Sequence, residues 1–144
     1  MSLLNEKQIE IIIAAEQLFA EEGFDGTSVR DIAKVANVNI AMISYYFGSK
    51  EKLLESLLLY RVNSMRLTLE SVSQENISPV EKMNKLIATY VKRIHANRCI
   101  YQIIHFELSN KKREINFKEF IQLKKENLGF IEAIVKEGQE KGIY

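Results

Sequence analysis

The sequence predicts an all-α protein. Apolar residues recur at helical spacing along most of the chain, and no stretch alternates between apolar and polar residues for long enough to predict a strand. Helix breakers are few, because the 144 residues include one proline and six glycines. A hydrophobic content of 47% excludes a disordered chain. We therefore expect a globular helical protein with one or two small domains.

The composition excludes several classes of protein. Cys99 is the single cysteine, so the chain has neither an internal disulfide framework nor a cysteine-rich zinc site. No apolar run reaches the roughly 18 residues of a membrane helix, and no signal segment opens the chain. These absences predict a cytoplasmic protein with no membrane partner. We expect no cofactor and no metal.

The first 48 residues predict three helices. The first covers residues 5–22 and ends at Gly23, a typical C-cap. The pattern Ser28-x-x-Asp31 is a capping box that opens a short helix over residues 29–36. Asn39 is then the expected N-cap of a third helix over residues 40–47.

Four longer helices are predicted after residue 48. The first follows a cap at Ser49 and keeps helical period to about residue 72. The next begins at Ser78-Pro79-Val80-Glu81, which places serine, proline and glutamate at their preferred positions, and runs to residue 95 or 96. Asn97-Arg98 is the expected joint before the next helix, which runs through residue 108, and the last helix is predicted from about residue 116 to residue 140. The basic run Lys111-Lys112-Arg113 between them is interpreted as a solvated loop.

The helices predicted over residues 29–36 and 40–47 are joined by only about three residues. This spacing turns the second helix sharply across the first, which is the helix-turn-helix arrangement that places one helix in the major groove of DNA. Five residues are expected to face inward: Ile32, Ala33, Val38, Ile43 and Phe47. Five are expected to face outward: Asn39, Ile40, Ala41, Ser44 and Tyr45.

Two features next to this motif suggest a phosphate backbone as its partner. Tyr45 and Tyr46 supply two hydroxyls that can hydrogen-bond to phosphates. Lys50 lies in the first turn of the next helix, where a cation opposes the helix dipole. That placement is reasonable if Lys50 and the nearby N–H groups face a phosphate.

The residues of this region resemble the N-terminal domain of TetR-family repressors. The similarity lies in TSVRDIA at residues 27–33, Val38, and ISYYFGSKEKLL at residues 43–54. The preceding Ala14-x3-Leu18-Phe19-x3-Gly23-Phe24 fits the family's first helix. The match covers about residues 9–58, and the remaining helices fit the family's ligand-binding half only in layout.

The resemblance implies a helix-turn-helix DNA-binding domain over residues 1–48 and a helical ligand-binding and dimerisation domain over residues 49–144, with a long fourth helix joining them. It implies a sequence-specific DNA-binding transcriptional regulator, a repressor released by a small-molecule effector, and not an enzyme. The implied partners are a palindromic double-stranded operator, an effector of unspecified chemistry and a second copy of the chain.

The resemblance also implies roles for individual residues. Ser28, Tyr45, Tyr46 and Lys50 fall where family members hold the phosphate backbone, and Arg30 falls where an arginine reaches a guanine edge. The start of the recognition helix is formed by Asn39, Ile40, Ala41 and Met42. Ser44 departs from the family, in which an aromatic residue is common at this position. Because the side chains of Ile40, Ala41 and Met42 are apolar, we expect thymine-methyl contacts and DNA shape to contribute much of the specificity.

Two alternatives to a DNA-binding regulator stay open, a protein-binding module and a small enzyme. Residues 1–60 carry five basic and nine acidic side chains, a net of −4, whereas residues 81–126 carry a net of +6. An acidic first domain is also compatible with a helical module that contacts protein, which a salt titration of DNA binding would distinguish. A small enzyme that uses His95, His105 or Glu107 has the least support, because no nucleophile, base and orienting group recur at a usable spacing. Cys99 is interpreted as a small hydrophobic residue.

The chain ends at residues 141–144, about where the family's eighth helix would begin. In the family, two further helices usually build the dimer interface. The chain is therefore expected to be either truncated or unusually short, with the second domain incomplete at its C-terminal end, and we expect the intact protein to be a homodimer.

Overall fold

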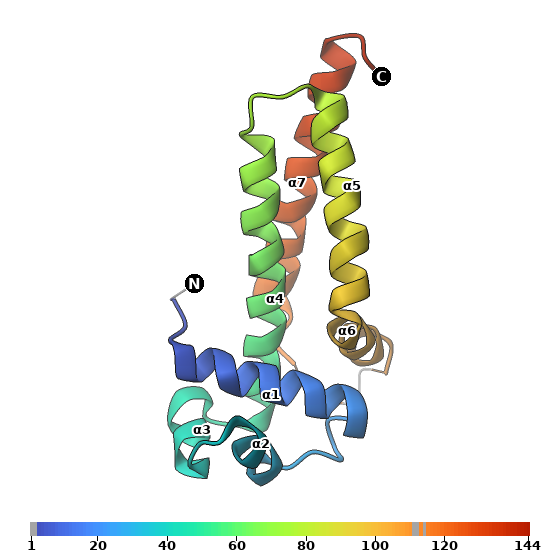
Figure 1. Ribbon diagram of the computed structural model, residues 1–144. Coiled ribbons are helices and arrows are strands. Elements are labelled where there is room, and N and C mark those ends of the chain that lie inside the picture. The colour runs from blue at the N-terminus through green and yellow to red at the C-terminus, as the bar shows by residue number, and fades with distance from the viewer. Residues whose placement is uncertain (1–2, 111–112, 114) are drawn as a thin grey trace. The chain divides into compact units, whose positions relative to one another are not determined.

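The computed structural model describes residues 3–144 except 111, 112 and 114. These residues form seven helices and no strand, which confirms the all-α prediction (Figure 1). The helices are α1 (Glu6–Glu22), α2 (Val29–Ala36), α3 (Ile40–Phe47), α4 (Lys50–Ser73), α5 (Pro79–Ala96), α6 (Arg98–Asn110) and α7 (Lys118–Glu140).

Side-chain caps explain most of these boundaries. Asn5, Ser28 and Ser78 begin α1, α2 and α5 with complete capping boxes, in which the cap side chain and the side chain three residues later exchange hydrogen bonds with the backbone. Two predicted ends are wrong. α6 continues to Asn110 rather than stopping at residue 108, and α7 begins at Lys118 rather than residue 116.

The helices group into two compact units. The first unit comprises Met1–Leu58 and Cys99–Asn116, and so contains α1, α2, α3, the beginning of α4 and nearly all of α6. α2 packs against both α1 and α3. The isoleucine and leucine side chains of this unit that are almost completely excluded from solvent are Ile11, Ile12, Ile32, Ile43, Leu53, Leu54, Leu57 and Leu58. Their burial holds the two short helices on the longer ones.

The second unit comprises Leu59–Arg98 and Phe117–Tyr144. Within it, the later turns of α4 lie beside α5 and α7 (Figure 1). Its core is a cluster of five buried residues, Met65, Leu69, Val72, Leu86 and Ile134. The contributors to this cluster come from all three helices, so the unit is a three-helix bundle.

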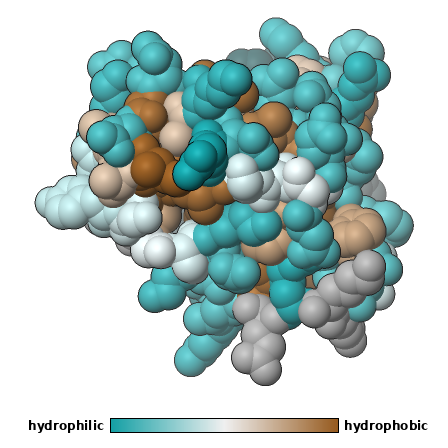
Figure 2. Space-filling view, turned by 90° about the horizontal axis from the view of Figure 1, so that it is seen from below, coloured by the Kyte–Doolittle hydropathy of each residue, from teal (hydrophilic) through white to brown (hydrophobic). Residues whose placement is uncertain are grey.

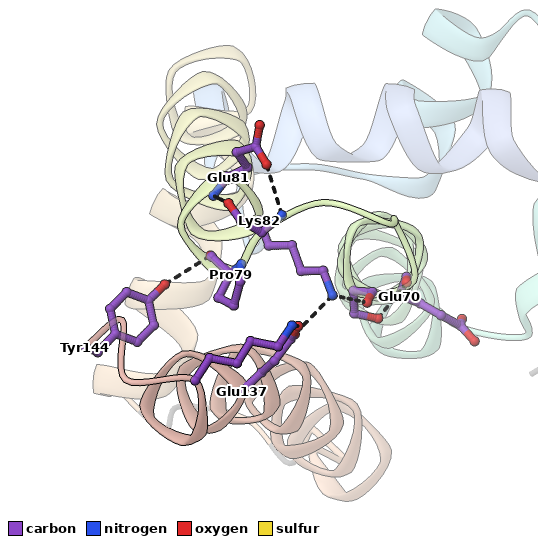
Figure 3. Close-up of polar contacts among 9 residues, drawn as sticks. Glu70, Pro79, Glu81, Lys82, Glu137 and Tyr144 are labelled. Carbon is purple, nitrogen blue, oxygen red and sulfur yellow. Dashed lines mark hydrogen bonds and ion pairs between the residues drawn. The ribbon is translucent and has the colours of Figure 1, made fainter.

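A polar cluster closes the end of this bundle where α4 stops. The buried Lys82 donates from Nζ to the backbone oxygen of Ser73 at 3.0 Å and to the Glu137 carboxylate at 3.1 Å (Figure 3). The Tyr144 hydroxyl donates to the backbone oxygen of Pro79 at 3.0 Å. Because the Lys82 ammonium is paired and hydrogen-bonded, its burial is tolerated.

None of the helices in the described ranges combines the length and the apolar character that crossing a lipid bilayer requires.

Candidate nucleic-acid interface

The α2–α3 pair is held by a three-residue turn. Asn37 adopts the left-handed conformation (φ 55°), which asparagine tolerates better than most residues, and its N–H bonds to the last carbonyls of α2. The Val38 N–H donates to the Ala33 oxygen at 3.0 Å. The Asn39 side chain then caps α3 by accepting from the Ala41 N–H at 2.9 Å. The chain therefore reverses sharply between the two helices, as the spacing predicts.

The structure divides the pair into the two faces expected from sequence. Four of the five residues expected to face inward, Ile32, Ala33, Ile43 and Phe47, are buried, and Val38 is half-buried. All five residues expected to face outward, Asn39, Ile40, Ala41, Ser44 and Tyr45, are exposed. The inward set anchors α3, so the outward set is presented on a fixed surface.

The exposed face of α3 carries large apolar and aromatic side chains. Tyr45 is 83% exposed and Ile40 43% exposed, whereas Met42 and Tyr46 are half-buried. The rings of Tyr45 and Tyr46 meet edge to face with centroids 5.4 Å apart. Seen from below, hydrophobic residues gather at the surface on the side where α3 lies, bordered by residues of intermediate hydropathy (Figure 2). Such an exposed group on an eight-residue helix is typical of a binding surface.

Ser28 and Arg30 lie at the start of α2, and both are exposed. Ser28 Oγ accepts from the Asp31 N–H at 3.0 Å, and the Asp31 carboxylate accepts from the Ser28 N–H at 3.0 Å. The backbone hydrogen bond from Ser28 is the main reason that the pKa of Asp31 lies below its usual value. The Ser28 hydroxyl still has its own O–H available as a donor.

The sequence predicts that Lys50 faces a phosphate, but in the structure its side chain binds to the protein's own backbone. Its ammonium donates to the backbone oxygens of Phe24 at 2.8 Å and Thr27 at 2.9 Å, and lies 4.2 Å from the centre of the Phe24 ring. A lysine has three N–H donors, so one is left for a further partner. Lys50 therefore fixes the loop that leads into α2, and a phosphate contact by it stays a prediction.

Arg113 corrects the interpretation of residues 111–113 as a solvated loop. Its side chain is 11% exposed, forms an ion pair with the buried Glu107, and forms another with Asp25 at 3.1 Å. Its guanidinium lies 4.1 Å from the centre of the Phe24 ring. Lys111 and Lys112 lie outside the described residues. Sequence reasoning missed this contact because Arg113 and Asp25 are 88 positions apart.

The residues considered for an enzyme or a metal site are not brought together. His95 and His105 are exposed, and Cys99 is half-buried. Glu107 is buried and paired with Arg113; burial raises its pKa, and the guanidinium opposes that rise. Within the described residues, no group of three histidine, cysteine, aspartate or glutamate side chains is placed to hold a metal ion.

Two family models match the chain. The model described as bacterial regulatory proteins, tetR family, matches residues 11–57. The model of the C-terminal region of YsiA-like proteins, which also carries the TetR name, matches residues 60–144 and so covers more than half of the chain. The chain belongs to the TetR family. The family and the named relatives of this TetR protein are regulators of transcription, not enzymes.

Curated relatives include the probable transcriptional regulator YttP of Bacillus subtilis, which is 35% identical over 138 residues. Another is the transcriptional repressor NicS of Pseudomonas putida, 31% identical over 143 residues. The matches cover 94% and 93% of the chain and 66% and 64% of these relatives. The TetR chain thus spans somewhat less than two thirds of the length of both proteins.

Solved structures share the fold. The fatty acid degradation regulator FadR from Bacillus halodurans is 27% identical with a TM-score of 0.82, over 99% of this chain and 73% of that one. FadR from Bacillus subtilis, in a crystal structure with stearoyl-CoA, is 25% identical with a TM-score of 0.77, over 94% of this chain and 72% of that one. The chain therefore shares the fold of these TetR-family regulators over nearly all of its length.

Proposed function

We propose that this TetR-family chain binds operator DNA through α3 and represses transcription until a small molecule releases it. The observation that supports this most strongly is the exposed face of α3, where Ile40, Ala41, Ser44 and Tyr45 lie on a helix that is anchored by Ile43 and Phe47. A short helix exposed on one side and fixed on the other is suited to enter the major groove.

The proposed contacts fall into two groups. Side chains that hold the phosphate backbone set the register of the protein on DNA, and side chains that reach base edges read the sequence. The first group is Ser28, Tyr45, Tyr46 and Lys50. The second group is Arg30, Asn39, Ile40, Ala41, Met42 and Ser44. Apolar side chains in the second group favour thymine methyl groups, and Arg30 favours guanine.

We divide the functions at residue 48, with DNA binding in residues 1–48 and effector binding and dimerisation in residues 49–144. The second unit offers a polar group for a ligand. Asn127 is 5% exposed and donates to the Val62 oxygen at 3.3 Å, but its Oδ1 has no hydrogen-bond partner among the described residues. A buried acceptor of this kind is paired in most proteins, so a ligand hydroxyl or amide would stabilise it.

The first effector to test is a long-chain acyl-CoA. Its support is the likeness to Bacillus subtilis FadR, whose structure holds stearoyl-CoA, and to the fatty acid metabolism regulator of the same organism, 27% identical over 136 residues. The effector acts by binding one conformation more tightly than another, with a coupling on the order of 1–3 kcal/mol.

A homodimer and a palindromic operator complete the proposal. Dimeric helix-turn-helix proteins place their two DNA-binding domains about one turn of DNA apart, and the symmetry of the operator mirrors that of the dimer. A regulator that acts on the bacterial chromosome works in the cytoplasm, which is the location we propose.

The experiment is selection of bound duplexes from random DNA, followed by release with stearoyl-CoA. We expect enrichment of a palindromic sequence and a lower affinity for it when the acyl-CoA is added. Free CoA is the matched control, because it lacks the acyl chain. Failure to enrich any duplex would contradict DNA binding, whereas enrichment without release would contradict only the choice of effector.

A further inference from the structure

A cavity of about 320 Å³ lies within the first unit, between the end of α1, the loop that follows it, and α6. This volume falls at the lower end of the range of small-molecule sites, roughly 300–1,000 Å³. Much of its wall is apolar and is formed by Phe19, Phe24, Leu54, Ile103 and Phe106. A compact aromatic molecule fits a space of this size and character.

The charged groups of the cavity are mostly acidic. Among the described residues, its lining includes the carboxylates of Glu22, Asp25 and Glu107 and one cation, Arg113. Glu107 is 4% exposed, so its carboxylate depends on a cationic partner. Burial raises the pKa of Glu107, which is the expected response of a carboxylate that is poorly solvated.

Arg113 occupies the cavity in the manner of a bound cation. Its guanidinium lies over the Phe24 ring at 4.1 Å and pairs with Glu107 on one side and Asp25 on the other. An aromatic face combined with carboxylates is the arrangement by which proteins recognise organic cations. Arg113 belongs to neither α6 nor α7, so its displacement breaks no helix.

We propose that this cavity binds a small organic cation, whose charged group replaces the Arg113 guanidinium on the Phe24 ring and the Glu107 carboxylate. An anion is repelled by the excess of carboxylates, and a neutral molecule cannot replace the ion pair. The site goes beyond the effector proposed above and uses residues of the first unit alone.

The test uses three molecules of the same shape: benzamidinium, benzamide and benzoate. The amidinium group matches a carboxylate in a bidentate manner, as a guanidinium does. Isothermal titration of the full chain should detect benzamidinium and neither of the other two. E107Q should weaken the binding, and R113A should strengthen it by about tenfold because the internal competitor is gone.

A second measurement covers the possibility that R113A is poorly folded. Removal of Arg113 leaves Glu107 buried without its partner, so R113A should melt at a lower temperature than the unmodified protein. Benzamidinium should raise that melting temperature, or restore helicity to an unfolded sample, and benzamide should not. The matched control is R66A, which removes an arginine from the Arg66–Glu70 ion pair of the second unit and should gain nothing from benzamidinium beyond the unmodified protein.

Either of two results would overturn the proposal. The first is equal affinity for benzamidinium and benzamide in the unmodified protein and in R113A. The second is a stabilisation of R113A by benzamidinium that is no larger than the stabilisation of R66A.

Discussion

Phe24 is the central residue of the loop that precedes α2. Its buried ring packs against Phe19 with centroids 5.2 Å apart and lies close to the cations of both Lys50 and Arg113. Thr27, in the same loop, is buried and donates from its hydroxyl to the Gly23 oxygen at 2.7 Å. The loop is thereby fixed at several points, and it ends at Ser28, the first residue of the proposed DNA-binding surface.

Lys50→Met tests this part of the structure. The substitution keeps the aliphatic stem but removes the ammonium that bonds to the Phe24 and Thr27 oxygens. Hydrogen bonds from a charged donor contribute more than neutral ones, so we expect a loss of about 1–2 kcal/mol in the free energy of unfolding, measured with urea. Lys52→Met, at an exposed position two residues later, is the control. Equal stability of K50M and K52M would contradict the described role.

The sequence was sufficient to predict which residues of α3 are exposed, because a helix anchored by Ile43 and Phe47 must present Ser44 and Tyr45 on the other side. It was not sufficient to predict the partners of Lys50 or Arg113. Lys50 bonds to carbonyls 23 and 26 positions earlier. Periodicity describes neighbours on one helix and carries no information about such distant pairs.

At the level of the helices, short-range chemistry determined the boundaries that were predicted well. α2, α3 and the start of α5 agree with prediction because their caps lie within three residues of the helix they begin. α7 differs because Phe117 at its start makes no side-chain cap. The N–H of Asn116 instead donates to the Glu55 carboxylate at 2.8 Å, a contact between distant residues.

The capping box of α2 predicts a dependence of stability on pH. The pKa of Asp31 is lowered in the folded protein, chiefly by the hydrogen bond from the Ser28 N–H. A lowered pKa stabilises the fold when Asp31 is ionised, and this contribution is lost as the pH falls below about 4. We expect D31N to melt below the unmodified protein at neutral pH and to approach it in acid. A difference in melting temperature that stays constant with pH would contradict the assignment.

For the molecule as a whole, a net charge of +1 conceals an acidic N-terminal part and a basic later part. The seven helices within the described residues were predictable from the helical spacing of their apolar residues. The membership of α6 in the first unit, however, follows from contacts that no local pattern encodes. Charge alone would have argued against DNA binding by residues 1–60, and the geometry of α3 argues for it.

The scarcity of cations on the proposed interface predicts a shallow salt dependence. Arg30 and Lys50 are its only two cationic side chains, and each neutralised phosphate contributes about −0.9 to the slope of log K against log salt. Because Arg30 is assigned to a base edge, only Lys50 of each subunit neutralises a phosphate, so we expect a slope of about −2 for a dimer on the selected duplex, measured by fluorescence anisotropy. A slope near −10 would require cations elsewhere, and the absence of DNA affinity at any salt concentration would favour the protein-binding alternative.

The most direct test of DNA binding by α3 is the operator affinity of Tyr45→Phe. Tyr45 is 83% exposed, so loss of its hydroxyl leaves the fold intact, and a lost hydrogen bond to a charged phosphate should weaken binding about tenfold. Tyr101→Phe, at another exposed tyrosine of the same unit, should leave the affinity unchanged. Equal operator affinities for Y45F, Y101F and the unmodified protein would contradict the account.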